Sequence, residues 1–138
     1  MYFLTACTIG RRRILANAET HEALIAFGRK ASASGVLVGR YVIMPDHLHL
    51  FAAFGRQSPS LSEWIKALKR TLAKQLRQRE GAAVCWQKGF FDHVMRSEES
   101  YEQKWLYVQQ NPARAGLVRD SKNWPYQGEI YPLTVRLL

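Results

Sequence analysis

The sequence predicts an α+β domain of the ferredoxin-like class, in which split βαβ units form an antiparallel sheet with helices on one face. Three observations support this fold: a β-α-β-β-α-β order of segments, three helices with N-terminal capping residues, and a Pro-Asp turn between two adjacent strands. Such a sheet would leave its other face free for a ligand. With 138 residues and a hydrophobic fraction of 47%, the chain 1–138 is expected to be a single domain.

Segments rich in β-branched, aromatic and leucine residues predict the strands of the first half. The expected elements are a strand over 2–9, a helix capped by Asn17 that runs to about residue 33, a strand over 36–44 and a strand over 47–54. Pro45 and Asp46 separate the last two strands, which predicts a tight turn there.

The helix predicted from residue 61 has the clearest signature in the chain. Ser60 and Glu63 form a capping box, and apolar residues recur at helical spacing from Leu61 to Leu76. The remaining elements are a strand over 84–91, a helix capped by Ser97 that runs to about residue 110, and a short helix from Pro112.

The formal net charge of +9 indicates a polyanionic partner, and nucleic acid fits better than a membrane surface because no amphipathic anchor accompanies the charge. Cys7 and Cys85 form neither a disulfide framework nor a zinc motif. No apolar stretch approaches the roughly 20 residues of a spanning helix, and the first apolar run lacks the basic start of a signal peptide. We therefore expect a reduced, cytoplasmic protein with no membrane partner.

His47 and His49 are the first candidate site residues, because alternate residues of a strand share one face roughly 7 Å apart. Two imidazoles on one face of a strand can bind a single divalent ion or a phosphate. The alternative is that both histidines are merely exposed or hydrogen-bonded.

The second candidate is Tyr107, on the helix that follows Ser97. Tyr101, Trp105 and Val108 follow helical spacing and predict a buried stripe, and Tyr107 lies about 200° around the axis from Trp105. Its phenol is therefore expected outside the core and available for chemistry. Asn111 would lie beside Tyr107 if the helix continues, but as part of an Asn-Pro pair it could cap the next helix, which the spacing favours.

Two motifs together resemble a known family: Met-Pro-Asp-His-Leu-His-Leu over 44–50, and Tyr-Val-Gln-Gln-Asn-Pro-Ala-Arg-Ala-Gly-Leu-Val over 107–118. They look like the motifs of the single-tyrosine HUH transposases, which are IS200-like. The second motif most resembles the branch associated with repetitive extragenic palindromes (REP). The similarity extends from Tyr2 to about Tyr126 and includes residues 86–92.

The resemblance implies a metal-dependent endonuclease and strand transferase that cuts and rejoins single-stranded DNA beside hairpins or palindromes, through a 5′-phosphotyrosine intermediate. It implies Tyr107 as the nucleophile, with His47, His49 and Asn111 as ligands of Mg²⁺ or Mn²⁺. Asp46 takes the position before the first histidine, where it could orient His47 or cap the turn at Pro45. We expect the turn role.

Basic residues predict where DNA would bind, and Trp86 or Phe90 could stack on a base if they are not core residues. The expected contacts are Arg40, Lys66, Lys69, Arg70, Lys74, Lys88 and Arg114. His93 is expected to form only a surface pair with Asp92. Two other functions stay open: a non-catalytic nucleic-acid-binding module of the same fold, and a metal-dependent nuclease that uses water, with Tyr107 only structural. A monomer and a homodimer are both compatible with the sequence.

Overall fold

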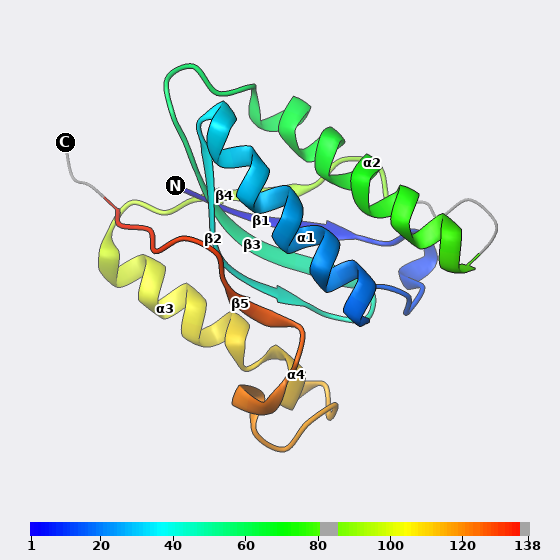
Figure 1. The fold of residues 1–138 in the computed structure, drawn as a ribbon. Helices are drawn as coiled ribbons and strands as arrows, with labels where there is room; N and C mark the ends of the chain where they lie inside the picture. The colour runs from blue at the N-terminus through cyan, green and yellow to red at the C-terminus, as the bar shows by residue number, and fades with distance from the viewer. Residues whose placement is uncertain (81–85, 136–138) are drawn as a thin grey trace.

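The computed structural model describes residues 1–80 and 86–135 (Figure 1). Its helices and strands, in chain order, are β1 (Tyr2–Cys7), η1 (Ile9–Arg11), α1 (Ala18–Ala31), η2 (Ser32–Ser34), β2 (Val36–Ile43), β3 (His47–Phe54), α2 (Leu61–Glu80), β4 (Phe91–Val94), α3 (Glu98–Gln109), α4 (Asn111–Arg114), η3 (Ser121–Asn123) and β5 (Gln127–Glu129).

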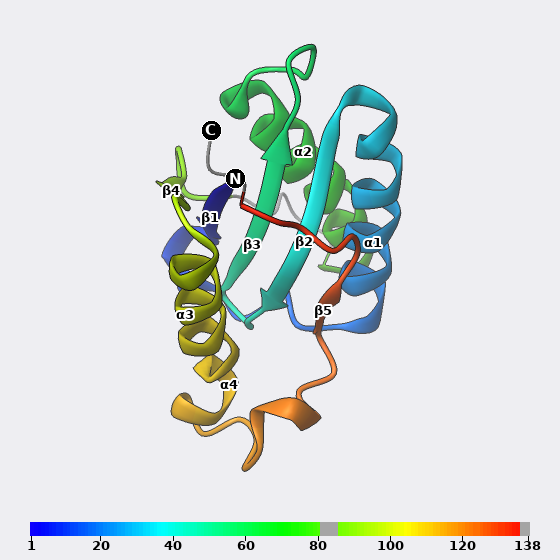
Figure 2. The same cartoon turned by 90° about the vertical axis from the view of Figure 1, so that its left-hand side faces the viewer.

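A five-stranded sheet in the order β4-β1-β3-β2-β5 organises the fold, and every neighbouring pair is antiparallel (Figure 2). The order of the first four strands is that of the split βαβ pattern, which confirms the predicted ferredoxin-like class. The short strand β5 was not predicted, and it extends the sheet beyond β2.

The two faces of the sheet are covered by different helices. Leu4, Leu48 and Leu50 belong to the main core, which also contains the apolar stripes of α1 and α2. The opposite face, which we expected to be free, carries α3 (Figures 1 and 2). There Tyr101 of α3 packs edge-on against the ring of Phe51, with the ring centroids 4.8 Å apart. The aromatic stripe of α3 needs an apolar surface for its burial, and this sheet face supplies it.

The local signals for the helix starts are confirmed. The Asn17 side chain accepts a hydrogen bond from the Thr20 amide, and the Ser97 side chain accepts one from the Ser100 amide. Ser60 Oγ accepts a hydrogen bond from the Glu63 amide over 3.2 Å. Each bond satisfies an amide that has no partner inside the first turn of its helix.

The strand predicted over 84–91 is wrong. Residues 84–85 lie outside the described residues, and β4 begins only at Phe91. Trp86 and Phe90 pack against the main core from a segment outside the named strands, so their apolar character indicates burial and not strand structure. All four residues of β4 are exposed, so neither face of this strand requires apolar residues. Its sequence Phe-Asp-His-Val accordingly shows no alternation of apolar and polar residues.

The first strand ends two residues earlier than predicted, at Cys7. The chain then turns in η1, where Gly10 and Arg11 have positive φ angles of 62° and 53°. A non-glycine residue seldom adopts this left-handed conformation, so surrounding contacts must hold Arg11 in place. None of the helices within 1–80 and 86–135 is long and apolar enough to cross a membrane.

Candidate active site

A tight turn between β2 and β3 places the histidine pair at the start of β3. The Met44 amide donates to the His47 carbonyl oxygen over 2.8 Å and closes this turn. His47 and His49 alternate with Leu48 and Leu50, so both imidazoles share the sheet face opposite the main core. Their ring centroids lie 4.7 Å apart, which is close enough for the two rings to share one ligand.

Each imidazole is oriented through its Nδ1 atom. His47 Nδ1 pairs with Asp46 Oδ1 at 2.8 Å, and the other carboxylate oxygen of Asp46 accepts from Arg11 Nε at 2.8 Å. His49 Nδ1 pairs with Thr5 Oγ1 at 2.8 Å. The Nε2 atom of each ring therefore remains for a ligand. Asp46, which we expected to cap the turn, instead orients His47 in the way that carboxylates orient metal-binding histidines.

The surroundings of the pair favour neutral imidazoles. Burial lowers the pKa of His49 to about 3. Electrostatic repulsion from His47 adds to this effect, and so do the more distant cations Lys104, Arg11 and Arg114. Burial also lowers the pKa of His47, although Asp46 partly opposes the shift. A neutral imidazole has a free lone pair at neutral pH, which is the form that binds a metal ion.

Tyr107 lies on α3 with its phenol outside the core, as predicted, and its side chain is 65% exposed. The guanidinium carbon of Arg114 stands over the phenol ring, 4.1 Å from the ring centroid. This contact is a cation–π interaction, and it supports one face of the ring. A free hydroxyl on a supported ring suits a nucleophile.

A chain of contacts connects the tyrosine helix to the histidine pair. Lys104, one turn before Tyr107 on α3, places its ammonium 5.3 Å from the ring centroid of Phe3, and this ring stacks on His49 with the centroids 5.2 Å apart. Arg114 is near enough to influence the pKa of His49. The tyrosine and both histidines of a single chain thus lie on the same side of the sheet.

Asn111 is the first residue of α4, and the helix-cap role favoured by the spacing is wrong. The N-cap of α4 is Gln110, which has helical angles, so α3 continues almost directly into α4. The Asn111 side-chain oxygen accepts a hydrogen bond from Arg114 Nη2 over 3.1 Å. Its part as a metal ligand stays a prediction. In 1–80 and 86–135, no group of three or more His, Cys, Asp or Glu residues is placed to hold a metal.

The basic residues predicted to contact DNA fall into two groups. Lys66, Arg70 and Lys74 are exposed and follow one another at intervals of four residues along α2, so they form one stripe. Lys88 is also exposed, in the segment before β4. These four cations are available to a polyanion, and so is Arg114, which is exposed beside Tyr107.

The other two predicted cations have partners within the protein. Lys69 donates to the backbone oxygens of Gln87, over 3.0 Å, and of Gly89, and burial lowers its pKa. Arg40 forms ion pairs with Glu102 at 3.0 Å and Glu129 at 3.4 Å. Both cations are therefore engaged within the protein, and their expected contacts with DNA stay predictions.

The two aromatic residues considered for stacking are only partly accessible. The indole N–H of Trp86 donates to the Lys69 carbonyl oxygen over 3.0 Å, and the ring packs against the main core. Phe90 packs against the same core. By contrast Phe91, the last residue of the strand predicted over 84–91, is 69% exposed.

Sequence reasoning missed three contributors to the site: Arg11, Thr5 and Lys104. Arg11 precedes Asp46 by 35 residues, and Thr5 precedes His49 by 44. The strand register that brings Thr5 opposite His49 follows from the pairing of β1 with β3, which short sequence windows do not contain. Lys104 was detectable only as a basic residue one turn before Tyr107.

The geometry defines a class of protein: a ferredoxin-like domain that presents a histidine pair and a tyrosine on one side of its sheet. Comparison with known proteins agrees with this class. The family model described as "Transposase IS200 like" matches residues 1–111. The chain therefore belongs to the IS200-like transposase family, and the resemblance seen in the two motifs is confirmed.

Two curated proteins and one solved structure resemble the chain. A REP-associated tyrosine transposase of Escherichia coli K12 is 26% identical over 64% of this chain, and a Haemophilus influenzae protein provisionally given the same name is 29% identical over 65%. The matched regions span 52% and 61% of those relatives. The structure of a REP-associated tyrosine transposase bound to a REP hairpin shares the fold, with a TM-score of 0.71 and 19% identity over 99% of this chain and 92% of that one.

Proposed function

We propose that this protein cleaves and rejoins single-stranded DNA by transesterification, with Tyr107 as the nucleophile. The observation that carries the proposal is the arrangement on one sheet side: two oriented imidazoles with free Nε2 atoms, and an exposed phenol held by Arg114. The alternative of two incidental surface histidines does not account for Nδ1 partners on both rings or for their shared burial.

The residues fit a divalent cation. His47 and His49 would supply two neutral nitrogen ligands, with Asn111 as a third ligand if its amide exchanges Arg114 for the ion. Bound there, Mg²⁺ or Mn²⁺ would polarise the scissile phosphate and offset the charge that develops on its oxygens. Imidazole ligands suit Mn²⁺ better than Mg²⁺, so we expect higher activity with Mn²⁺.

In the reaction that we propose, the Tyr107 oxygen attacks the phosphorus of one DNA phosphodiester. A bond between the phenolic oxygen and phosphorus forms, the bond to the 3′-oxygen breaks, and this oxygen leaves as a 3′-hydroxyl. The tyrosyl proton passes to solvent. The product is a 5′-phosphotyrosine ester, and attack by a second 3′-hydroxyl on this ester rejoins the strand without any other energy source.

The DNA would carry a hairpin next to its single-stranded segment. Support comes from the related structure bound to a REP hairpin and from the exposed stripe of Lys66, Arg70 and Lys74 on α2, which suits a phosphate backbone. Hairpin recognition and strand cleavage would then use separate surfaces of one domain.

The experiment that tests the proposal is a denaturing gel of the protein incubated with labelled single-stranded DNA that carries its flanking palindrome. Wild-type protein with Mn²⁺ should give a slowly migrating covalent adduct, and Tyr107→Phe should give none while it binds the same DNA on a native gel. Tyr131→Phe removes a hydroxyl that contacts Ser32 over 3.4 Å and serves as the matched control.

Two results would reject the proposal in favour of a specific alternative. Free cleaved ends that persist in Tyr107→Phe would indicate a nuclease that uses water. Tight binding with neither adduct nor cleavage, under both metals and on several palindromic substrates, would indicate a non-catalytic binding module.

A further inference from the structure

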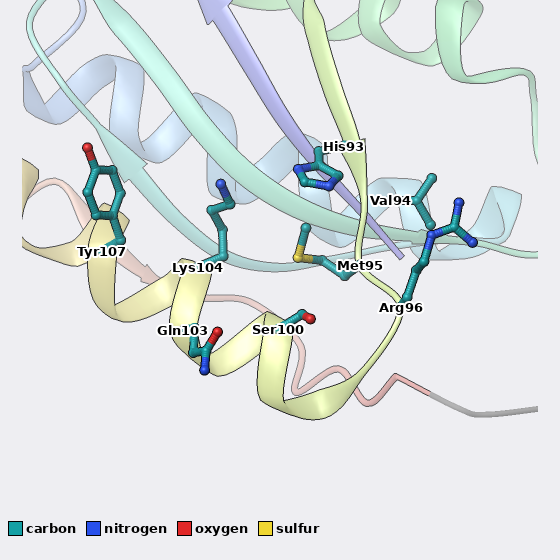
Figure 3. A pocket seen from close by; sticks show the side chains of 8 residues that line it. All are labelled: His93, Val94, Met95, Arg96, Ser100, Gln103, Lys104 and Tyr107. Carbon is teal, nitrogen blue, oxygen red and sulfur yellow. The ribbon is translucent and has the colours of Figure 1, made fainter.

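A groove of about 350 Å³ lies between β4 and α3, and it ends at Tyr107 (Figure 3). Figure 3 shows Tyr107 at one end and Arg96 at the other, with His93 and Lys104 between them. Ser100 and Gln103 of α3 add polar groups to its lining. The mechanism proposed above uses only the end with the tyrosine, so the rest of the groove has no assigned part.

The charge of the groove suits a nucleic acid backbone. Arg96 and Lys104 contribute two cations, and none of the described residues that line the groove is acidic. Lys104 also stands over the Phe3 ring that stacks on His49, so this cation borders both the groove and the histidine pair. A phosphate bound by Lys104 would therefore lie close to the phosphate that Tyr107 attacks.

The edge strand β4 adds an aromatic surface to the same side of the sheet. Phe91 pairs with Thr5 and His93 pairs with Phe3, so both point to the face that carries the histidine pair. The Phe91 ring is 69% exposed. Exposed aromatic rings beside cations are the usual means by which proteins hold unpaired bases without reading their sequence.

We propose that this surface, made of Phe91, His93, Arg96 and Lys104, binds the unpaired nucleotides that adjoin the phosphate attacked by Tyr107. The two rings stack on bases, and the two cations contact the phosphates between them. The inference rests on the proposed function for its link to cleavage. Its occupant is a short segment of single-stranded DNA, for which the basic lining and the continuity with Tyr107 both argue.

The test is fluorescence anisotropy with a labelled ten-nucleotide oligothymidylate and, separately, with a blunt hairpin that has no unpaired tail. The full chain carries Tyr107→Phe so that no covalent adduct interferes. Phe91→Ala and Arg96→Ala should each weaken binding of the oligothymidylate at least about fivefold, as expected when one stacking surface or one phosphate-binding cation is removed. Binding of the blunt hairpin should change less than about twofold.

Controls separate a local effect from a general one. Phe91→Trp should restore binding of the oligothymidylate, because tryptophan also offers a stacking surface. Arg29→Ala removes an exposed cation from α1, on the opposite side of the sheet, and should leave that binding unchanged. Since Phe91 is largely exposed, its replacement should leave the melting temperature near that of the parent, which circular dichroism can verify.

The inference is overturned if the oligothymidylate binds equally well to Phe91→Ala, Arg96→Ala and their parent, or if it does not bind at all. Its failure is distinct from failure of the proposed function. If Tyr107 forms the adduct, but neither its yield nor the binding of oligothymidylate changes in Phe91→Ala and Arg96→Ala, only the role inferred for this surface is rejected. If oligothymidylate binding depends on Phe91 and Arg96, but the wild-type chain forms no adduct, the surface keeps its inferred role and cleavage by Tyr107 is rejected.

Discussion

At the scale of single residues, the site depends on partners that fix the direction of each imidazole. Asp46 connects His47 to Arg11, and Thr5 holds His49. Arg11 adopts a left-handed conformation to reach Asp46, and its Nη2 atom lies 3.4 Å from His47 Nδ1. These contacts orient the two Nε2 atoms before any ligand arrives, which lowers the entropy lost on binding.

We therefore predict that Asp46→Asn weakens binding of Mn²⁺ about tenfold, because the amide does not stabilise His47 as a carboxylate does. Isothermal titration calorimetry measures the change. Asp92→Asn makes the same change of charge on the exposed strand β4 and should bind Mn²⁺ as the wild type does. Equal affinities of all three proteins would show that the contact between Asp46 and His47 has no part in metal binding.

At the scale of elements, sequence patterns predicted those parts whose signals are local. Asn17 and Ser97 cap the helices they precede, and β3 spans the residues expected of it. The sequence patterns did not predict the two strands β4 and β5. The four residues of β4 are all exposed, and β5 is a three-residue strand at the sheet edge that pairs with β2, so neither has an apolar pattern of its own.

The candidate site, like the helices and strands, was predictable only where its signals are local in the sequence. His47, His49 and Tyr107 have the expected placement because strand alternation and helical spacing determine it. The partners Thr5 and Arg11 come from segments far away in the chain, and only the sheet register and the turn in η1 bring them near. Long-range pairing of this kind has no signature in a short window of sequence.

The exposed stripe on α2 gives a prediction at the same scale. Replacing Lys66, Arg70 and Lys74 together by Gln should weaken hairpin binding and make it less sensitive to salt. The plot of log affinity against log salt should become shallower by about 0.9 for each phosphate that the variant no longer neutralises. Anisotropy titrations over a range of NaCl concentrations measure the slope. As a control, the exposed residues Arg56, Arg119 and Lys122 are replaced together by Gln. An equal loss of affinity and salt sensitivity in this control would contradict a specific role of α2.

At the scale of the whole molecule, three histidines tie stability to pH. Burial lowers the pKa values of His21, His47 and His49 in the folded protein. The unfolded chain therefore takes up protons, as pH falls below about 6.5, that the folded chain does not accept. These histidines therefore leave the free energy of unfolding unchanged above this pH and reduce it as the pH falls below it.

His49 dominates this effect because its pKa in the folded state is about 3. We expect it to remove roughly 2 kcal/mol of stability between about pH 6.5 and pH 5, and to lower the melting temperature by several degrees. Differential scanning calorimetry at both pH values measures the loss, and His49→Gln should reduce it. His93→Gln changes an exposed histidine as a control. An identical pH dependence in wild type and His49→Gln would contradict this assignment.

The packing of α3 on the sheet of its own chain, through Tyr101 and Phe51, has a kinetic consequence. If nucleophile and metal ligands belong to one polypeptide, the rate per molecule of protein should not fall on dilution, and the reaction should be first order in protein. For the same reason an equimolar mixture of His47→Ala and Tyr107→Phe should form no adduct, because neither defective chain can lend its intact half to the other. Adduct in that mixture would show that chains exchange their tyrosine helices, and that cleavage requires an encounter between two copies.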